Sequence, residues 1–408
     1  MFIHIKHKKT AFISLLCVAQ LLIGESPIPN AQGLRAQEEI ADRIRGSLVA
    51  GSLGDAMGAP TEFVSSLSEI YQQFPNGIHS FADFQPKDIV PYTDDTALTL
   101  VTAEASMQGI QACVDYGIGG IDRFMGHLVR AYIKDMHAPD GWAKPSRAPG
   151  TGCLKNVRYL VSLGYEADNG DTWKAGLHEL RDAAKTGKLA GGGCGAVMRA
   201  HPFGLLYRRY KNGEVMADFA AQHSLLTHGS LQSMASCAAM ATGVAAAVQG
   251  KNVPDIIEGM IAAAARYDGI TAVLLRNAVA LAEKNKKLIE KYDYKKLPIA
   301  LANGKSKLAQ AEQENVHNPV FEKHLGWLAH DAIAATVYIF ALYPDDIKRA
   351  IYLGVHTPGD SDSIASMAGA LVGARVGYKK VEKSYSADIA RLEGRERIMQ
   401  LADKIIAF

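Results

Sequence analysis

The chain has 408 residues, 48% of them hydrophobic and 21% charged, so it can bury a large core, and disordered or fibrous classes are excluded. Lysine and arginine (44) nearly balance aspartate and glutamate (42), and the formal net charge of +2 gives no sign of a dedicated nucleic-acid binder. Five cysteines, no two of them spaced C-x-x-C, indicate neither a disulfide scaffold nor a structural zinc site.

The N-terminal residues 1–31 have the composition of a secretory signal peptide. Residues 1–9 are basic, and the stretch from Ala11 to Gly24 is almost wholly apolar. That stretch is shorter than the roughly 20 apolar residues that a membrane-spanning helix needs. A clean small-residue cleavage motif is missing. We predict export to the periplasm or the medium, and the alternatives are an uncleaved anchor or a cytoplasmic protein whose leader is not functional.

From residue 38 onward, the chain has the pattern of successive helices. Ile40, Ile44 and Leu48 recur at four-residue steps, which places them on one apolar stripe. Alternating strand patterns are scarce. Further stretches rich in helix formers are 97–107, 230–248, 255–265, 270–282, 330–342 and 363–376. We therefore predict an all-α fold with a single compact helical domain over residues 38–408.

One Lys-rich segment stands out within this domain. Residues 283–322 contain Pro298, Gly304 and Pro319, which are typical of irregular surface structure. A solvated face is the simplest interpretation of its lysines. We predict a variable excursion at residues 283–322, and we expect the chemistry of the domain in other loops between its helices.

Two clusters of carboxylates precede predicted helices at distant points of the chain. One is Tyr-Thr-Asp-Asp-Thr at residues 92–96, and the other is Gly-Asp-Ser-Asp-Ser at residues 359–363. The second is no EF-hand loop, because Ala365 and Leu371 occupy the positions of the required Gly and Glu. Helix capping explains one oxygen at each helix start. Two acids and a hydroxyl exceed that need and suit one or two hard cations, so these residues leave capping and a metal site open.

Two glycine-rich segments could bind phosphate oxygens through backbone N–H groups. They are residues 147–152 and 191–196, and neither matches a Walker A or G-x-G-x-x-G sequence, so plain turns are the alternative. His223 and His228 are five residues apart, which favours separate buried or capping histidines over a metal pair. The sequence contains no H-E-x-x-H or G-x-S-x-G motif, which counts against zinc proteases and standard serine hydrolases.

Five segments, taken together and in order, carry a resemblance to a known family. They are residues 46–58 with Glu62 following, Thr-Asp-Asp-Thr at 93–96, Gly-Cys-Gly-Ala-Val-Met-Arg at 193–199, Leu-Thr-His at 226–228 and Gly-Asp-Ser-Asp-Ser at 359–363. In this order they resemble the ADP-ribosylglycohydrolases, the group that includes dinitrogenase reductase-activating glycohydrolase. The resemblance implies a compact all-α ADP-ribosylglycohydrolase-like fold with two Mg²⁺ ions, for which Mn²⁺ can substitute.

The resemblance also implies roles for individual residues. Glu62 is the implied catalytic acid, and a metal-bound aspartate such as Asp362 is the alternative carrier of the proton. Ser363 stands where the family usually has Thr. The implied metal ligands are Thr93, Asp94, Asp95, Asp360, Asp362 and Ser363. The implied substrate-binding residues, near the diphosphate and adenosine of ADP-ribose, are Gly150, Thr151, Gly152, Gly193, Gly195, Met198, Arg199 and His228.

The expected function is that of a metal-dependent hydrolase that cleaves the glycosidic bond between ADP-ribose and a protein side chain or a small conjugate. Such cleavage passes through an oxocarbenium-like state, which needs an acid for the leaving group and a delivered water. The expected partner is an ADP-ribosylated protein or conjugate, with no dedicated nucleic-acid binding and no membrane span after signal removal. The alternative is a catalytically weak relative that binds an ADP-ribosylating toxin as an immunity protein.

Overall fold

The computed structural model describes residues 31–115, 121–164, 182–183, 186, 191–291 and 325–408. The chain divides at Glu39, so that residues 40–408 form one unit. The described residues before this point, 31–39, are the first turns of a helix. The predicted signal peptide lies outside the described residues, except for Ala31 at the start of that helix.

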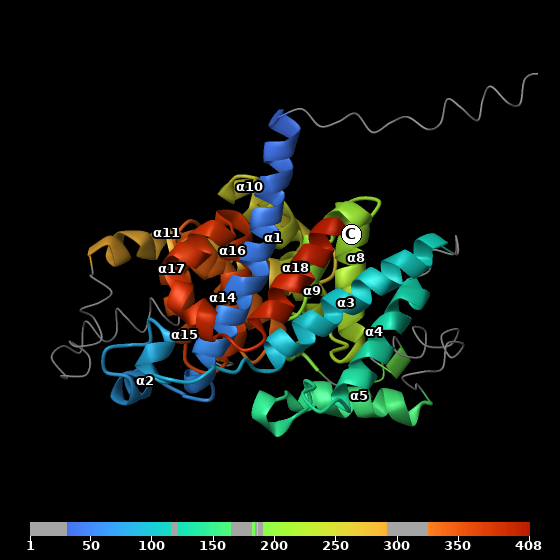
Figure 1. The fold of residues 1–408 in the computed structure, drawn as a ribbon, viewed down its shortest axis with the longest axis horizontal. Helices are drawn as coiled ribbons and strands as arrows, with labels where there is room; N and C mark the ends of the chain where they lie inside the picture. Colours follow the sequence, from blue (N-terminus) through green and yellow to red (C-terminus); the bar gives the residue numbers. More distant parts are fainter. Residues whose placement is uncertain (1–30, 116–120, 165–181, 184–185, 187–190, 292–324) are drawn as a thin grey trace, which may run out of the picture. The chain divides into compact units, whose positions relative to one another are not determined.

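The described residues form helices and no strand, which confirms the predicted all-α class. Two isolated bridges, Val90 with Leu392 and Gly193 with Leu328, are the extended pairings among them. The α-helices (Figure 1) are α1 (Ala31–Gly58), α2 (Leu67–Gln73), α3 (Asp94–Asp115), α4 (Ile121–Met136), α5 (Thr151–Ser162), α7 (His201–Leu205), α8 (Gly213–His223), α9 (Leu231–Val248), α10 (Val253–Ala265), α11 (Gly269–Lys291), α14 (Ala329–Leu342), α15 (Ile347–Val355), α16 (Ser361–Val376), α17 (Tyr378–Arg391) and α18 (Arg395–Ala407). Short 3-10 helices lie at Ala59–Thr61, Phe81–Asp83, Pro145–Arg147, Cys194–Ala196, Tyr207–Arg209 and Ser224–Leu226.

The helices predicted from periodicity are all present. The predicted stretches fall within α3, α9, α10, α11, α14 and α16, with ends that differ by a few residues. The predicted excursion at 283–322 begins inside α11, which continues to Lys291, and its remainder lies outside the described residues. Local helix propensity and side-chain period are therefore sufficient to locate most of these elements.

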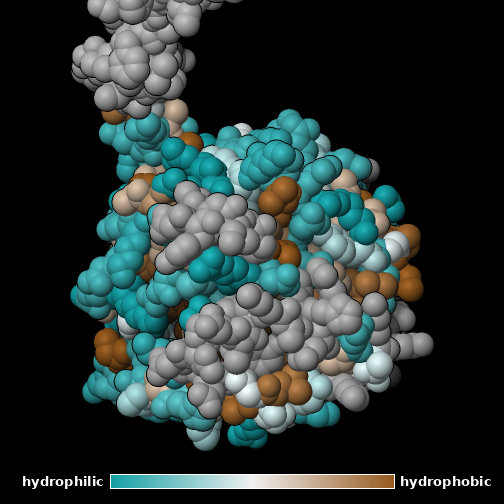
Figure 2. Space-filling model, turned by 90° about the vertical axis from the view of Figure 1, so that its right-hand side faces the viewer, coloured by the Kyte–Doolittle hydropathy of each residue, from teal (hydrophilic) through white to brown (hydrophobic). Residues whose placement is uncertain are grey.

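Helices α9, α14 and α16 pack against one another at the centre of this unit. Their sequences are rich in Ala, and nearly every side chain of α14 and α16 is buried. By length and composition alone, helix α9 could cross a membrane. However, 78% of it is buried inside the fold, as expected of a core helix. The coloured residues on the face shown in Figure 2 are mainly hydrophilic, with scattered apolar side chains.

Close packing of α1 against α16 places the two carboxylate clusters beside each other. A Cβ atom on Gly54 would lie 2.1 Å from the Ala365 carbonyl oxygen, and one on Gly58 would lie 2.4 Å from the Asp362 Cα atom. These glycines therefore allow α1 to touch the first turns of α16. As a result, Asp55, which lies between them in α1, is held next to the start of α16 and fully buried.

Candidate active site

Most of the predicted site residues meet at one cavity of about 640 Å³. The cavity lies where the starts of α3, α5 and α16 converge with the loop that follows α1 and with the 3-10 helix Cys194–Ala196. The predicted residues that line it are Glu62, Asp94, Asp95, Gly150, Thr151, Gly152, Gly193, Gly195, Met198, His228, Asp360, Asp362 and Ser363. Two predicted residues, Thr93 and Arg199, are not among the residues that line it.

The start of α3 is capped by a residue from α1 rather than by its own acids. Asp55 accepts hydrogen bonds from the backbone N–H of Thr93 (3.0 Å) and Thr96 (2.9 Å), and from the Thr93 hydroxyl (2.8 Å). Burial raises the pKa of Asp55 to about 6 even though these bonds favour its charged form. Because Asp55 satisfies the helix start, Asp94 and Asp95 are not needed as caps.

At the start of α16, the acid at the cap position does not serve as a cap. The residue at the cap position, Asp360, makes no side-chain capping bond. Its carboxylate Oδ2 instead accepts a contact of 2.6 Å from the Cys194 thiol. Asp362 accepts a bond from the Ser363 backbone N–H (2.9 Å), and the Ser363 hydroxyl lies 3.3 Å from the Asp95 Oδ2 atom. The hydroxyl of Ser363 thus joins the two clusters, and capping alone does not explain either of them.

The acids of the cavity are buried without a matching positive charge. Asp94, Asp95, Asp360 and Asp362 are each at most 5% exposed. Within the described part of the chain, no lysine or arginine lines this cavity. Asp94 accepts a long bond from the Gly150 backbone N–H (3.3 Å), and the buried Oδ1 atom of Asp95 has no hydrogen-bond partner among the described residues. A buried anion of this kind is costly unless a cation neutralises it.

This crowding raises the pKa of every carboxylate in the cluster. Burial, followed by repulsion from Asp362, holds the pKa of Asp94, Asp95 and Asp360 well above the usual value for aspartate. Burial also raises the pKa of Asp362. The pKa of Glu62 rises to about 10, first through burial and then through the charges of Asp362 and Asp360. In the absence of a cation the cluster therefore takes up protons to relieve its own repulsion.

The donor atoms of the cavity fit a hard divalent cation. In the described chain, His, Cys, Asp and Glu side chains do not form a ready group of three around one point. Sites for Mg²⁺ commonly combine one or two carboxylates with hydroxyls and water, so a closed set of three is not required. The unpartnered Asp95 oxygen beside the Ser363 hydroxyl supplies a position of this kind.

The two predicted residues outside the cavity lining, Thr93 and Arg199, make hydrogen bonds behind it. Thr93 is buried and donates its hydroxyl to Asp55. Arg199 is fully buried, and it donates to the Gly195 carbonyl oxygen (2.5 Å), to the Thr227 hydroxyl (2.5 Å) and to the Tyr132 hydroxyl (3.0 Å). The structure therefore places Arg199 behind the wall, where it fixes the glycine-rich turn rather than reaching into the cavity.

The two glycine-rich segments enclose His228. A Cβ atom on Gly152 would lie 2.9 Å from the ring, one on Gly191 2.9 Å, and one on Gly195 2.8 Å, so larger residues at these positions would displace the histidine. Its Nδ1 atom lies 2.9 Å from the Thr227 hydroxyl. Burial and the nearby Arg199 lower the pKa of His228 to about 3, so the ring is neutral at pH 7.

Sequence reasoning missed four residues that shape the site: Asp55, Phe63, Cys194 and Trp327. Phe63 has a positive φ of 69° and is 67% exposed, and its ring stacks on that of Trp327 at 5.1 Å at the edge of the cavity. Asp55 and Cys194 lie inside the matched segments, but their spacing carries no sign of a role. No pattern in the sequence distinguishes Phe63 or Trp327, because their proximity is a long-range contact.

Comparisons with known proteins show which family and fold the chain is similar to. The profile of the ADP-ribosylglycohydrolase family matches residues 36–407. The chain is 23% identical to the "ADP-ribosylhydrolase ARH3" of Danio rerio, over 89% of this chain and 90% of the relative, and 25% identical to that of Bos taurus, over 89% and 92%. It is 24% identical to the "Uncharacterized protein YegU" of Escherichia coli K12, over 85% and 92%. A solved structure described as an ADP-ribosylglycohydrolase-related protein complex shares the fold, with a TM-score of 0.53 at 17% identity over 91% of this chain and 99% of that one.

Proposed function

Because the chain belongs to the ADP-ribosylglycohydrolase family, we propose that it is a divalent-cation-dependent hydrolase that cleaves the glycosidic bond between ADP-ribose and a protein side chain or a small conjugate. Two relatives named ADP-ribosylhydrolase support the substrate class. The observation that carries the proposal is the acidic cavity, in which Asp55 takes over the capping of α3 and Asp95 keeps an unpartnered buried oxygen.

Asp94, Asp95, Asp360 and Asp362, with the Ser363 hydroxyl, would hold the cations. Their oxygens suit Mg²⁺ best, and Mn²⁺ accepts the same ligand types. When bound, such cations stabilise negative charge on substrate oxygens as Lewis acids. Thr93 lies behind this set and supports it through its bond to Asp55.

Glu62 is the proposed proton donor to the leaving group. It lines the cavity, is half-buried, and in the cation-free protein has a pKa raised to about 10, first by burial and then by the neighbouring aspartates. Burial, the largest cause, persists when cations neutralise the aspartates. A carboxyl that keeps its proton near neutral pH can protonate the departing atom as the bond to the anomeric carbon breaks. Asp362 is the second candidate for the proton.

The glycine-rich segments are the proposed diphosphate site. Helix α5 begins at Thr151, and its cap residue Gly150 makes no side-chain bond to the free N–H groups of the first turn. The N-terminus of a helix favours an anion, because its N–H groups and dipole point toward it. Gly152, Gly193 and Gly195 line the same region around the neutral ring of His228.

Release of free ADP-ribose is the test of this function. The purified chain without residues 1–31 is incubated with arginine- and serine-ADP-ribosylated proteins, with Mg²⁺ or with a chelator. We expect release that requires the cation, and the conjugate that is cut identifies the linkage. If every conjugate stays intact although the protein binds Mg²⁺, the hydrolase proposal fails and the immunity-protein alternative gains support.

We also propose that the protein is exported, on the strength of the basic and apolar segments within residues 1–31. Fractionation of cells that carry the tagged full-length chain tests this. The shortened chain is expected outside the cytoplasm, and a full-length chain confined to the cytoplasm contradicts export.

A further inference from the structure

We propose that the sulfur of Cys194 is a direct ligand of the divalent cation held by Asp360, so that the centre is a mixed oxygen and sulfur site. Such a centre binds thiophilic cations such as Zn²⁺ and Cd²⁺ more tightly, relative to Mg²⁺, than an all-oxygen site would. The inference rests on the proposed function only for the existence of a cation site.

The thiol lies among the proposed ligands. The Cys194 Sγ atom lies 2.6 Å from the Asp360 Oδ2 atom and 3.7 Å from the Ser363 hydroxyl oxygen. Cys194, Asp360 and Ser363 line the same cavity. A second sulfur, that of Met198, lies 3.6 Å from the Ser363 hydroxyl. One short turn thus presents a thiol and a thioether to the start of α16.

The backbone fixes the position of this thiol. The Cys194 backbone N–H donates to the Trp327 carbonyl oxygen (3.1 Å), and the Cys194 carbonyl oxygen accepts from the Val197 N–H (2.8 Å). Gly193, directly before it, pairs with Leu328 in an isolated bridge. A ligand held in this way loses little conformational freedom when it binds a cation.

A second observation in the cavity points to a cation at this position. Asp95 is 2% exposed and lines the same cavity, and within the described ranges its Oδ1 atom has no hydrogen-bond partner. Its other oxygen lies 3.3 Å from the Ser363 hydroxyl, which also lies 3.7 Å from the thiol. The Ser363 hydroxyl thus lies within 3.7 Å of the thiol and 3.3 Å of the Asp95 carboxylate, so a cation bound beside Asp360 and this hydroxyl would have the unpartnered carboxylate close by.

The chemistry of the step is a simple exchange of a proton for a cation. In the cation-free protein the thiol keeps its proton and donates a hydrogen bond to Asp360. When the cation binds, the S–H bond breaks, the S–metal bond forms from the sulfur electron pair, and one proton leaves to solvent. Thiophilic cations gain most from the sulfur, because thiolate is a soft ligand.

The chain offers a matched control in a second cysteine of the same cavity. Cys153 lines the cavity and is buried, but its sulfur accepts a bond from Arg199 (3.4 Å) instead of contacting a carboxylate. A substitution there changes a cavity thiol without removing the proposed ligand. Cys153→Ser therefore separates the effect of ligation from that of any thiol in the cavity.

Titration with Cd²⁺ tests the inference, because sulfur-to-cadmium charge transfer absorbs in the near ultraviolet. The full chain is titrated with Cd²⁺ and, separately, with Mg²⁺. We expect this absorption in the unsubstituted protein and in Cys153→Ser, and its loss in Cys194→Ser. The ratio of Cd²⁺ to Mg²⁺ affinity is expected to fall roughly tenfold or more in Cys194→Ser.

A second measurement needs no variant. Alkylation of individual cysteines is followed by mass spectrometry of their peptides, and Cd²⁺ is expected to slow the modification of Cys194 far more than Mg²⁺ does. If Mg²⁺ and Cd²⁺ bind but neither the absorption nor the protection of Cys194 appears, the inference is overturned while the proposed function stands. If neither cation binds, both are overturned.

Discussion

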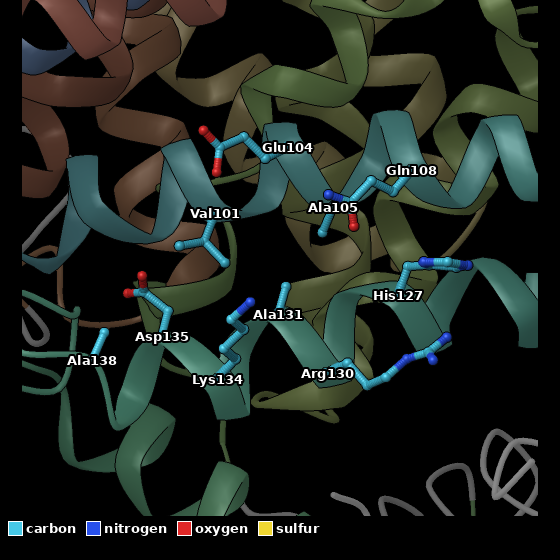
Figure 3. Close-up of a pocket in the computed structure, with 10 residues that line it drawn as sticks. All are labelled: Val101, Glu104, Ala105, Gln108, His127, Arg130, Ala131, Lys134, Asp135 and Ala138. Atoms are coloured by element: carbon cyan, nitrogen blue, oxygen red, sulfur yellow. The ribbon is translucent and has the colours of Figure 1, made fainter. Parts of the chain in front are cut away.

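Two hollows in this protein take acidic residues from the same helix, α3, and differ in what surrounds them. The first is the cavity at the start of α3, where Asp94 and Asp95 are buried and no lysine or arginine of the described chain lines the wall. The second, of about 470 Å³, lies between α3 and α4 and contains Glu104 (Figure 3). Their comparison separates an acid that needs an external cation from one that does not.

The acids of the hollow between α3 and α4 already have partners. Glu104 forms an ion pair with Arg397 at 3.3 Å, and Asp135 accepts a bond from the Trp142 backbone N–H (2.9 Å). Arg130 and Lys134 of α4 also line this hollow (Figure 3). Acidity alone therefore does not define a site. The buried acids at the start of α3 are different because no lysine or arginine in the described part of the chain lines their cavity.

Removal of both acids at the start of α3 is expected to have the largest effect. In Asp94→Asn/Asp95→Asn, ADP-ribose release should fall roughly 1000-fold, because the substrate oxygens lose their cation. Steady-state kinetics measures this loss. Glu104→Gln on the same helix is the control, and its kcat/KM should remain close to that of the unsubstituted protein. Equal losses in both variants would contradict the distinction between the two hollows.

Asp55 should matter for stability as well as for the site. Asp55→Ala removes the acceptor of three hydrogen bonds from Thr93 and Thr96 at the buried start of α3. The free energy of unfolding is expected to fall by about 3 kcal/mol. Urea denaturation measures this, with Glu104→Ala as the comparison, for which an exposed ion pair predicts a loss of about 1 kcal/mol or less. A stability of Asp55→Ala equal to that of Glu104→Ala would show that Asp55 does not cap α3.

Glu62 should be needed for the reaction but not for cation binding. Glu62→Gln keeps the shape of the side chain and removes the proton donor, so kcat is expected to fall roughly 100-fold. The rise in Tm caused by Mg²⁺ should persist, which a stability scan with and without the cation would reveal. A variant with unchanged kcat would remove Glu62 from the mechanism and leave Asp362 as the candidate donor.

The pH dependence of stabilisation by the cation is the smallest of the expected effects. The pKa values of the cavity acids are raised in the folded protein, with that of Asp55 at about 6, so the cation-free fold loses their contribution to stability as pH rises above about 4. Mg²⁺ neutralises the ionised acids and should restore about 2 kcal/mol when its concentration is about thirty times its Kd. The increase in Tm should therefore be larger at pH 8 than at pH 5. The reverse order would contradict cation binding by these acids.

Much of the fold could be predicted from the sequence, because helix period and propensity are local properties. The predicted helices at residues 97–107 and 363–376 lie within α3 and α16. The motif order also identified most residues that line the cavity. These successes depend on neighbours in sequence or on motifs, which the chain displays directly.

What could not be predicted depends on contacts between distant residues. The pattern at residues 92–96 could not show that Asp55, on another helix, caps α3 and leaves Asp94 and Asp95 available. Arg199 belongs to a predicted substrate-binding run, but its donors are used inside the wall. The contact between Cys194 and Asp360 joins segments 166 residues apart. A motif shows which chemical groups are present. Only the folded structure shows which of their atoms already have partners.

The most direct test of the account is a titration of Mn²⁺, followed by electron paramagnetic resonance, against the unsubstituted protein, Asp94→Asn/Asp95→Asn and Glu104→Gln. The account predicts saturable binding that Mg²⁺ displaces, its loss in the double variant, and its retention in Glu104→Gln. Binding that is absent from the unsubstituted protein, or that survives in the double variant, would contradict the claim that the buried acids at the start of α3 hold a cation.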